Sequence, residues 1–152
     1  MSNLRIESSG GLTRVTLARP EVRNAFNDEL IGELAATFGA LPAGTRVVVL
    51  GGDGQAFCAG ADLAWMQRSV AYDEARNSRE ARELGAMFRA VDEAPCVVIA
   101  RVQGAALGGG AGLVAGVRVR PDDGRRDSGP VPQQPAGDRV LPRLPQGREA
   151  PG

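Results

Sequence analysis

Two short glycine-rich segments carry backbone groups that could do chemistry. "GADLAWMQ" (residues 60–67) and "LGGGAG" (residues 107–112) each place glycine before an apolar run typical of a helix. Glycine tolerates positive φ and lets a ligand approach the main chain closely. The first N–H groups of a helix lack intrahelical partners, and the helix dipole favours negative charge beside them. Such donors suit an anion, or a carbonyl oxygen that gains negative charge. Glycines that serve only tight turns are the alternative for either segment alone.

The composition excludes several side-chain chemistries. The chain has 152 residues, enough for one ordinary domain, with 18 basic residues, 18 acidic residues and no histidine. Every basic residue is arginine, which excludes lysine Schiff bases and P-loops, and the lack of histidine excludes histidine triads and most zinc sites. We expect no metal. Cys58 and Cys96 lack CxxC spacing and are expected to be buried or reduced thiols. Zero net charge predicts no nucleic-acid partner and no membrane partner.

Four segments have the patterns of strands. Residues 4–8 and 12–18 alternate polar and apolar side chains and predict a hairpin that turns at Ser9-Gly10-Gly11. Residues 46–50 and 96–102 are continuous apolar runs, typical of strands buried on both faces of a sheet. Each of these two runs leads into one of the glycine-rich segments. Because the carboxyl ends of neighbouring parallel strands meet at one crevice, we expect the two segments to form a joint site.

Helices are expected between these strands. Asn27 is a candidate N-cap for a helix that Pro42 and Gly44 end, with the apolar positions Leu30, Leu34, Phe38 and Leu41. A helix begins at Asp62, and a second helical stretch extends to about Glu93, with Ala81, Leu84, Phe88 and Val91 on one face. Strands that alternate with helices predict a layered α/β fold.

A dinucleotide-binding loop is a rival interpretation of the second glycine-rich segment. Gly110, Gly112 and Ala115 fit the fingerprint G-x-G-x-x-A after a strand. The fingerprint also needs an acidic residue at the end of a following strand, and the sequence offers none at the required distance.

Three blocks, in this order and spacing, resemble the enoyl-CoA hydratase/isomerase (crotonase) family. They are "RNAFN" (23–27), "AFCAGADLAWMQR" (56–68) and "ARVQGAALGGGAGLVA" (100–115). The resemblance covers residues 1–115, and the wording of the middle block is similar to methylglutaconyl-CoA and carboxygeranoyl-CoA hydratases. It implies a crotonase-like spiral of ββα units, truncated here to its N-terminal part. Intact members of the family assemble as homotrimers or hexamers.

The resemblance also implies a site for an acyl-CoA thioester. The backbone amides of Ala61 and Gly109 match the two donors of the family's oxyanion hole, which holds the thioester oxygen as it becomes enolate-like. Further positions match the path of the coenzyme A and acyl groups: Arg23, Ala25, Ala59, Asp62, Leu63 and Leu107. Arg23 as a solvated surface charge is the alternative, and we expect Trp65 and Met66 to be core residues or walls of the acyl pocket. Coenzyme A belongs to the substrate, so no separate cofactor is expected.

The acid/base residues of the family's hydratases are missing. Gly112 stands at the position of the first glutamate, and the second would fall near Pro132, where "GPVPQQPAG" has no carboxylate. Adding water to an enoyl thioester needs a general acid/base. We expect a hydratase-type protein that binds an acyl-CoA and stabilises its enolate, with impaired or absent hydration activity. A non-enzymatic acyl-CoA-binding protein and an isomerase of the same family are the alternatives.

The composition changes near Gly116. Residues 117–152 hold seven prolines, seven arginines and no aromatic residue. Such a segment buries too little apolar surface to fold, so we expect a disordered Pro/Arg-rich tail or out-of-frame coding, with "GVRVRP" as a short strand at its start. Residues 1–116 are the expected folded part. The first ten residues lack the pattern of a signal peptide, and no apolar run reaches eighteen residues, so a cytoplasmic location is expected.

Overall fold

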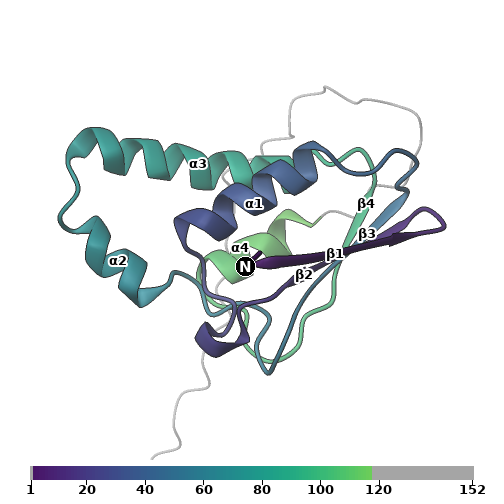
Figure 1. The fold of residues 1–152 in the computed structure, drawn as a ribbon, viewed down its shortest axis with the longest axis horizontal. Coiled ribbons are helices and arrows are strands. Elements are labelled where there is room, and N and C mark those ends of the chain that lie inside the picture. The colour runs from purple at the N-terminus through teal and green to yellow at the C-terminus, as the bar shows by residue number, and fades with distance from the viewer. Residues whose placement is uncertain (1, 118–152) are drawn as a thin grey trace, which may run out of the picture.

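The structure, a computed structural model, describes residues 2–117, which form a four-stranded sheet with helices along one face (Figure 1). The elements in chain order are β1 (Leu4–Ser9), β2 (Leu12–Leu17), the 3-10 turn η1 (Pro20–Val22), α1 (Asp28–Gly39), β3 (Val47–Gly52), α2 (Leu63–Ser69), α3 (Glu74–Asp92), β4 (Val97–Ala100) and α4 (Gly109–Gly116). The predicted α/β class is confirmed. The predictions for a tail and its initial strand lie, beyond Val117, outside the described residues.

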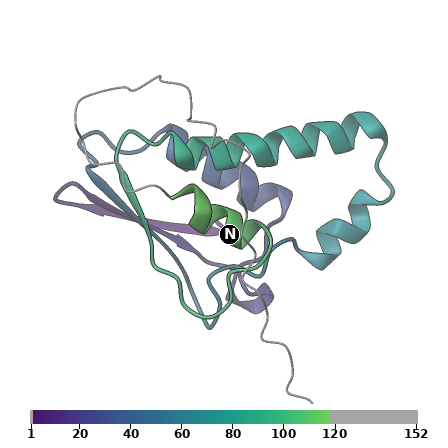
Figure 2. The same ribbon diagram turned by 180° about the vertical axis from the view of Figure 1, so that it is seen from behind.

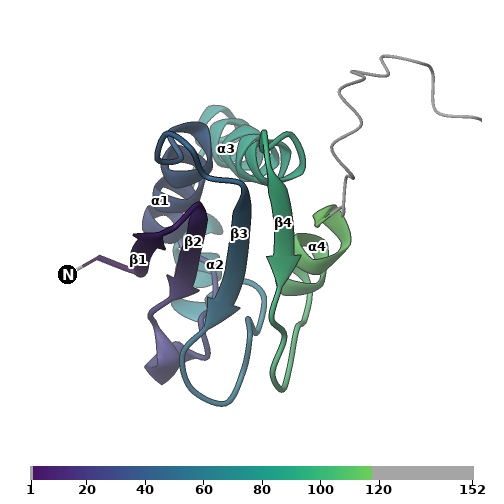
Figure 3. The ribbon, with the colours of Figure 1, turned by 90° about the vertical axis from the view of Figure 1, so that its right-hand side faces the viewer.

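The sheet has the order β1-β2-β3-β4, and Figure 3 shows the four strands side by side in this order. β1 and β2 form the predicted antiparallel hairpin, while β3 joins β2 and β4 joins β3 in parallel. In this register Val47 stands between Leu12 and Val97. The carboxyl ends of β3 and β4 therefore lie at the same edge of the sheet, where each strand leads into a glycine-rich segment.

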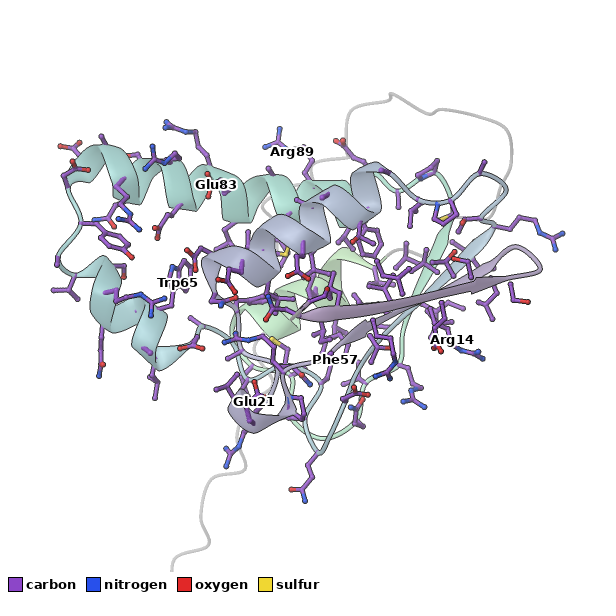
Figure 4. The ribbon with its side chains drawn as sticks, viewed as in Figure 1. Arg14, Glu21, Phe57, Trp65, Glu83 and Arg89 are labelled. Carbon is purple, nitrogen blue, oxygen red and sulfur yellow. The ribbon has the colours of Figure 1, made fainter. Side chains whose placement is uncertain are left out.

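The core lies between the sheet and the helices α1, α3 and α4 (Figures 1 and 2). Val48, Leu50 and Val98 are at most 2% exposed, but Val49 is half-buried and Ile99 is 45% exposed. The prediction that β3 and β4 are buried on both faces is therefore wrong for the described residues. Because helices within residues 2–117 cover only one face, alternate side chains point away from the core. Arg14 of β2 projects from that uncovered face in Figure 4.

The helices begin and end close to the positions predicted from the sequence. Asn27 caps α1 as predicted, since its side chain accepts a hydrogen bond of 2.9 Å from the Leu30 N–H. α1 ends at Gly39, before Leu41, which packs against the core from outside the helix. In α3 the buried face differs from the prediction: Ala81 is exposed and Met87 is fully buried. The first turns of α3 extend past the N-terminal end of α1 (Figure 1), so only the C-terminal half of α3 meets the core.

Candidate functional site

The two glycine-rich segments lie side by side, as the parallel strands predicted. We call residues 57–63, which end with the first residue of α2, the first glycine loop, and residues 103–110, which end with the first two residues of α4, the second. The Leu107 N–H donates a hydrogen bond of 2.9 Å to the Cys58 carbonyl, which joins the loops. Gly60 has φ +92°, and a Cβ there would lie 3.1 Å from the Leu107 carbonyl oxygen. Glycine at position 60 therefore allows the two loops to approach this closely.

Hydrogen bonds to Phe26 hold the peptide groups on both sides of Ala61. The Phe26 N–H donates to the Gly60 carbonyl at 2.7 Å, and the Asp62 N–H donates to the Phe26 carbonyl at 2.8 Å. The Ala61 N–H itself has no acceptor among residues 2–117, and Ala61 is exposed. This leaves one fixed backbone donor at the surface of the first loop.

The second loop presents a comparable donor at Gly109, the first residue of α4. Its N–H has no acceptor within the described part of the chain, and the N-cap residue Gly108 offers no side chain. Gly109 and Gly110 were expected to precede the helix, but they form its first turn. A Cβ at Gly109 would lie 2.6 Å from the Phe26 ring, and one at Gly110 would lie 2.5 Å from the Cys58 carbonyl oxygen. The N-terminus of α4 therefore packs through bare backbone.

The side chain of Asp62 is committed to holding the first loop. One carboxylate oxygen accepts hydrogen bonds from the N–H groups of Ala64 at 2.9 Å and Trp65 at 3.2 Å, and so caps α2. The other oxygen accepts a hydrogen bond of 3.0 Å from Arg19, in an ion pair whose side chains are 11–13% exposed. Burial raises the pKa of Asp62, but hydrogen bonds from Trp65, Arg19 and Ala64 outweigh it and hold the pKa below its usual value.

Arg19 and Asn24, which were not among the predicted site residues, support the first loop. The Arg19 N–H donates to the Asn24 side-chain oxygen at 2.9 Å, and the Asn24 N–H returns a bond of 2.8 Å to the Arg19 carbonyl. The fully buried Asn24 side chain also donates to the carbonyls of Asp53 and Ala56. Asn24 has φ +56°, a backbone region that asparagine tolerates. An asparagine shortly after an Arg-Pro turn was the signal available in the sequence.

The other predicted substrate-binding residues lie on or next to the first loop, except Leu107. Arg23 is exposed with φ +54°, and its carbonyl accepts a hydrogen bond of 3.0 Å from the Ala59 N–H. Ala25 is buried. Leu63 at the start of α2 is 76% exposed, and Leu107 on the second loop is 58% exposed. The structure therefore places two exposed apolar side chains on the two loops that carry the free amides.

The remaining predicted positions differ in burial. Trp65 packs against the core, pointing from α2 toward α1 in Figure 4, whereas Met66 is 49% exposed and is not a core residue. No residue of α2 is fully buried, and Met66 is among its exposed residues. A Cβ at Gly112 would lie 3.0 Å from the ring of Phe88. Phe88 thus occupies the space next to position 112.

Residues 2–117 contain neither a cluster of metal-binding side chains nor a helix that could span a membrane. No group of three or more histidine, cysteine, aspartate or glutamate side chains there is placed to hold a metal. Cys58 is buried, Cys96 is half-buried, both are free, and burial raises the pKa of each thiol. None of the helices in this part of the chain is long and apolar enough to cross a membrane.

Comparison with known proteins gives a consistent result. Residues 7–119 match the family described as enoyl-CoA hydratase/isomerase. A Rhodobacter capsulatus protein described as a probable enoyl-CoA hydratase is 37% identical over 116 residues, covering 76% of this chain and 44% of its own length. The crotonyl-CoA hydratase of Syntrophomonas wolfei is 35% identical, covering 73% of this chain and 43% of its own.

Solved structures show the same likeness in three dimensions. The crystal structure of an enoyl-CoA hydratase from Shewanella pealeana superposes with a TM-score of 0.73 at 32% identity, covering 75% of this chain and 44% of that one. The predicted crotonase-like fold is therefore confirmed for the matched part. The chain spans less than half the length of these relatives.

Proposed function

Because this chain belongs to the enoyl-CoA hydratase/isomerase family, we propose that it binds an acyl-CoA thioester and stabilises the enolate form through two main-chain amides. The donors are the N–H groups of Ala61 and Gly109. One observation carries the proposal: two loops in direct contact each present an amide that has no acceptor among residues 2–117. A preorganised donor of this kind contributes about 3–4 kcal/mol to stabilising a developing oxyanion.

The groups around the donors suit the rest of such a ligand. The exposed Leu63 and Leu107 offer apolar surface to an acyl or pantetheine chain, and the exposed guanidinium of Arg23 offers a partner for a phosphate. We propose that these residues, with the backbone of Ala25 and Ala59, line the path of the coenzyme A moiety. The crotonyl-CoA hydratase of Syntrophomonas wolfei carries such a ligand in its name.

Water addition needs a general acid/base. Among the described residues next to the two donors, the carboxylate of Asp62 is already engaged in other contacts. The Asp62 carboxylate caps α2 and pairs with Arg19, and a depressed pKa makes it a weak base. Gly112 has no side chain. We therefore propose a protein that polarises a bound thioester but hydrates it poorly. A non-enzymatic acyl-CoA-binding protein is the second candidate, since the free amides serve binding equally well.

Isotope-edited infrared spectroscopy of a bound acyl-CoA, labelled with ¹³C at the thioester carbonyl, tests the proposal. We expect the carbonyl band to move to lower frequency on binding, because two hydrogen bonds weaken the C=O bond. Replacing the Ala61 amide by a backbone ester removes one donor, and part of this shift should be lost. A band at the frequency of the free thioester would contradict the oxyanion hole. Tighter binding of NAD(P) than of acyl-CoA would favour the dinucleotide interpretation instead.

Turnover separates the two candidates. With a 2-enoyl-CoA, a hydratase removes the conjugated double bond, and the ultraviolet absorbance of the thioester falls. We expect binding with slow loss of absorbance. Binding with no loss above the uncatalysed rate would support the non-enzymatic candidate.

A further inference from the structure

Arg19 forms hydrogen bonds with Asn24, Ala25 and Asp62, which support the first glycine loop. It was not among the site residues predicted from the sequence. Its backbone closes the turn that ends at Asn24, through the reciprocal hydrogen bonds of 2.9 and 2.8 Å. Its guanidinium donates through one nitrogen to the Ala25 carbonyl and through the other to the Asp62 carboxylate. The Arg19 side chain is only 13% exposed, so this cation is held away from bulk solvent.

Both acceptors of the guanidinium flank the peptide that presents the Ala61 N–H. Ala25 directly precedes Phe26, whose N–H and carbonyl bond the peptide groups on both sides of Ala61. Asp62 directly follows Ala61 and caps α2. Holding Ala25 and Asp62 in fixed relative positions therefore fixes the direction of the Ala61 N–H.

We propose that Arg19 is a positioning residue for the Ala61 donor: its guanidinium aligns the first loop so that this amide points at the thioester oxygen. The inference rests on the proposed function. A planar guanidinium presents donors in a rigid fork and can bond two oxygens in fixed directions, whereas a lysine ammonium is a point charge on a flexible chain. Catalytic donors need placement within about 0.5 Å, which a packed and hydrogen-bonded support provides.

The test compares two ligands that differ in one oxygen. An acyl-CoA thioester has the carbonyl, and an alkyl-CoA thioether of the same chain length lacks it. In R19Q we expect the dissociation constant of the thioester to rise by up to about tenfold, since the loss of one hydrogen bond changes an equilibrium constant by about this much. The dissociation constant of the thioether should change by less than about twofold, because no donor to the carbonyl is involved. The infrared shift of the labelled carbonyl should shrink in parallel.

R19K and D62N refine the test and guard against a variant that does not fold. R19K keeps the charge but lacks the fork, so it should recover only part of the thioester preference. D62N keeps a cap oxygen for α2 but loses the charge of the ion pair, and asparagine is a good N-cap. If Arg19 acts through Asp62, the double variant R19Q/D62N should lose no more preference than R19Q alone.

The control is R5Q, which breaks the ion pair between Arg5 and Asp53 on the uncovered face of the sheet. It should leave the thioester preference and the carbonyl frequency unchanged. Equal weakening of thioester and thioether binding in R19Q would overturn the inference and assign Arg19 a purely structural role. If R19Q does not fold, D62N with an unchanged thioester preference would overturn it. A wild-type protein without a carbonyl shift would instead refute the proposed function itself.

Discussion

The two glycine loops present equivalent amides, but different interactions hold them. In the first loop, polar side chains fix the backbone: Arg19 and Asp62 form an ion pair whose side chains are largely buried, and Asn24 bonds the carbonyls that precede the loop. In the second loop, no side chain caps α4, and Gly109 and Gly110 rest against Phe26 and Cys58 with no room for a Cβ. One donor is thus held electrostatically and the other sterically.

Because the two loops are held by different interactions, we expect them to respond differently to pH and to added side-chain volume. Charge-assisted hydrogen bonds depend on protonation, and removing one partner leaves the other buried and unpaired. Close backbone packing has no titratable part, but it tolerates no added atom. Residues 103–117 contain no ionisable side chain, so the second loop should respond to volume and not to pH.

The largest effect is expected from D62A, which removes both the cap of α2 and the partner of Arg19. Breaking a buried ion pair by deleting one partner typically costs about 3–5 kcal/mol of the free energy of unfolding. We expect a loss near the lower bound, about 3 kcal/mol, measured by urea denaturation. D53A is the control, since its ion pair with Arg5 is exposed and should contribute less than about 1 kcal/mol. Equal losses in the two variants would contradict electrostatic support of the first loop.

A slightly smaller loss is expected from G110A in the second loop. The new Cβ would meet the Cys58 carbonyl oxygen at 2.5 Å and the Cys58 Cβ at 2.8 Å, and neither belongs to a flexible side chain. Overpacking of this kind costs about 1–3 kcal/mol. Urea denaturation gives the free energy, and the thioester dissociation constant should rise because α4 must shift. A stable G110A protein with unchanged binding would show that the loops are not in tight contact.

The sequence predicted the sheet and the adjacency of the loops because both follow from local patterns. Alternation in residues 4–8 and 12–18 specified the hairpin, and Asn27 specified the start of α1. Two apolar strands, each leading into glycines, specified two loops at one sheet edge. The burial of the outer face was predicted wrongly, since a run of valines looks the same whether one face or both are covered.

The ion pair that supports the first loop could not be predicted from the sequence. Arg19 and Asp62 are 43 positions apart, and nothing local distinguishes this arginine from exposed ones such as Arg23. The two segments are brought together by backbone hydrogen bonds of Phe26 and Arg23 with the first loop. Conversely, the glycines at 108–110 were expected to precede a helix, whereas Gly109 and Gly110 lie within α4 and pack closely against Phe26 and Cys58.

The pH dependence of stability should distinguish the loops. The pKa of Asp62 is lower in the folded chain than its ordinary value of 3.8, so the ionised form stabilises the fold. This contribution is complete above the ordinary pKa and is lost as the pH falls through the lower, folded pKa. The gap in unfolding free energy between wild type and D62N should therefore narrow as the pH is lowered from 6 toward 3. The gap between wild type and G110A should stay constant, and a parallel narrowing would contradict the division between the loops.

The smallest effect, of opposite sign, is expected from G85A in α3. Gly85 is exposed in a helix interior, and a Cβ there meets no atom within 4 Å. Alanine exceeds glycine in helix propensity by about 0.8–1.0 kcal/mol, so the free energy of unfolding should rise by about that amount. The substitution is chemically identical to G110A, and both positions are helical, so the difference between the two variants isolates the contacts of α4 from helix propensity. Destabilisation of similar size in both variants would mean that added volume is not what the second loop resists. A gain at position 85 with a loss at position 110 is the result that close packing of the second loop requires.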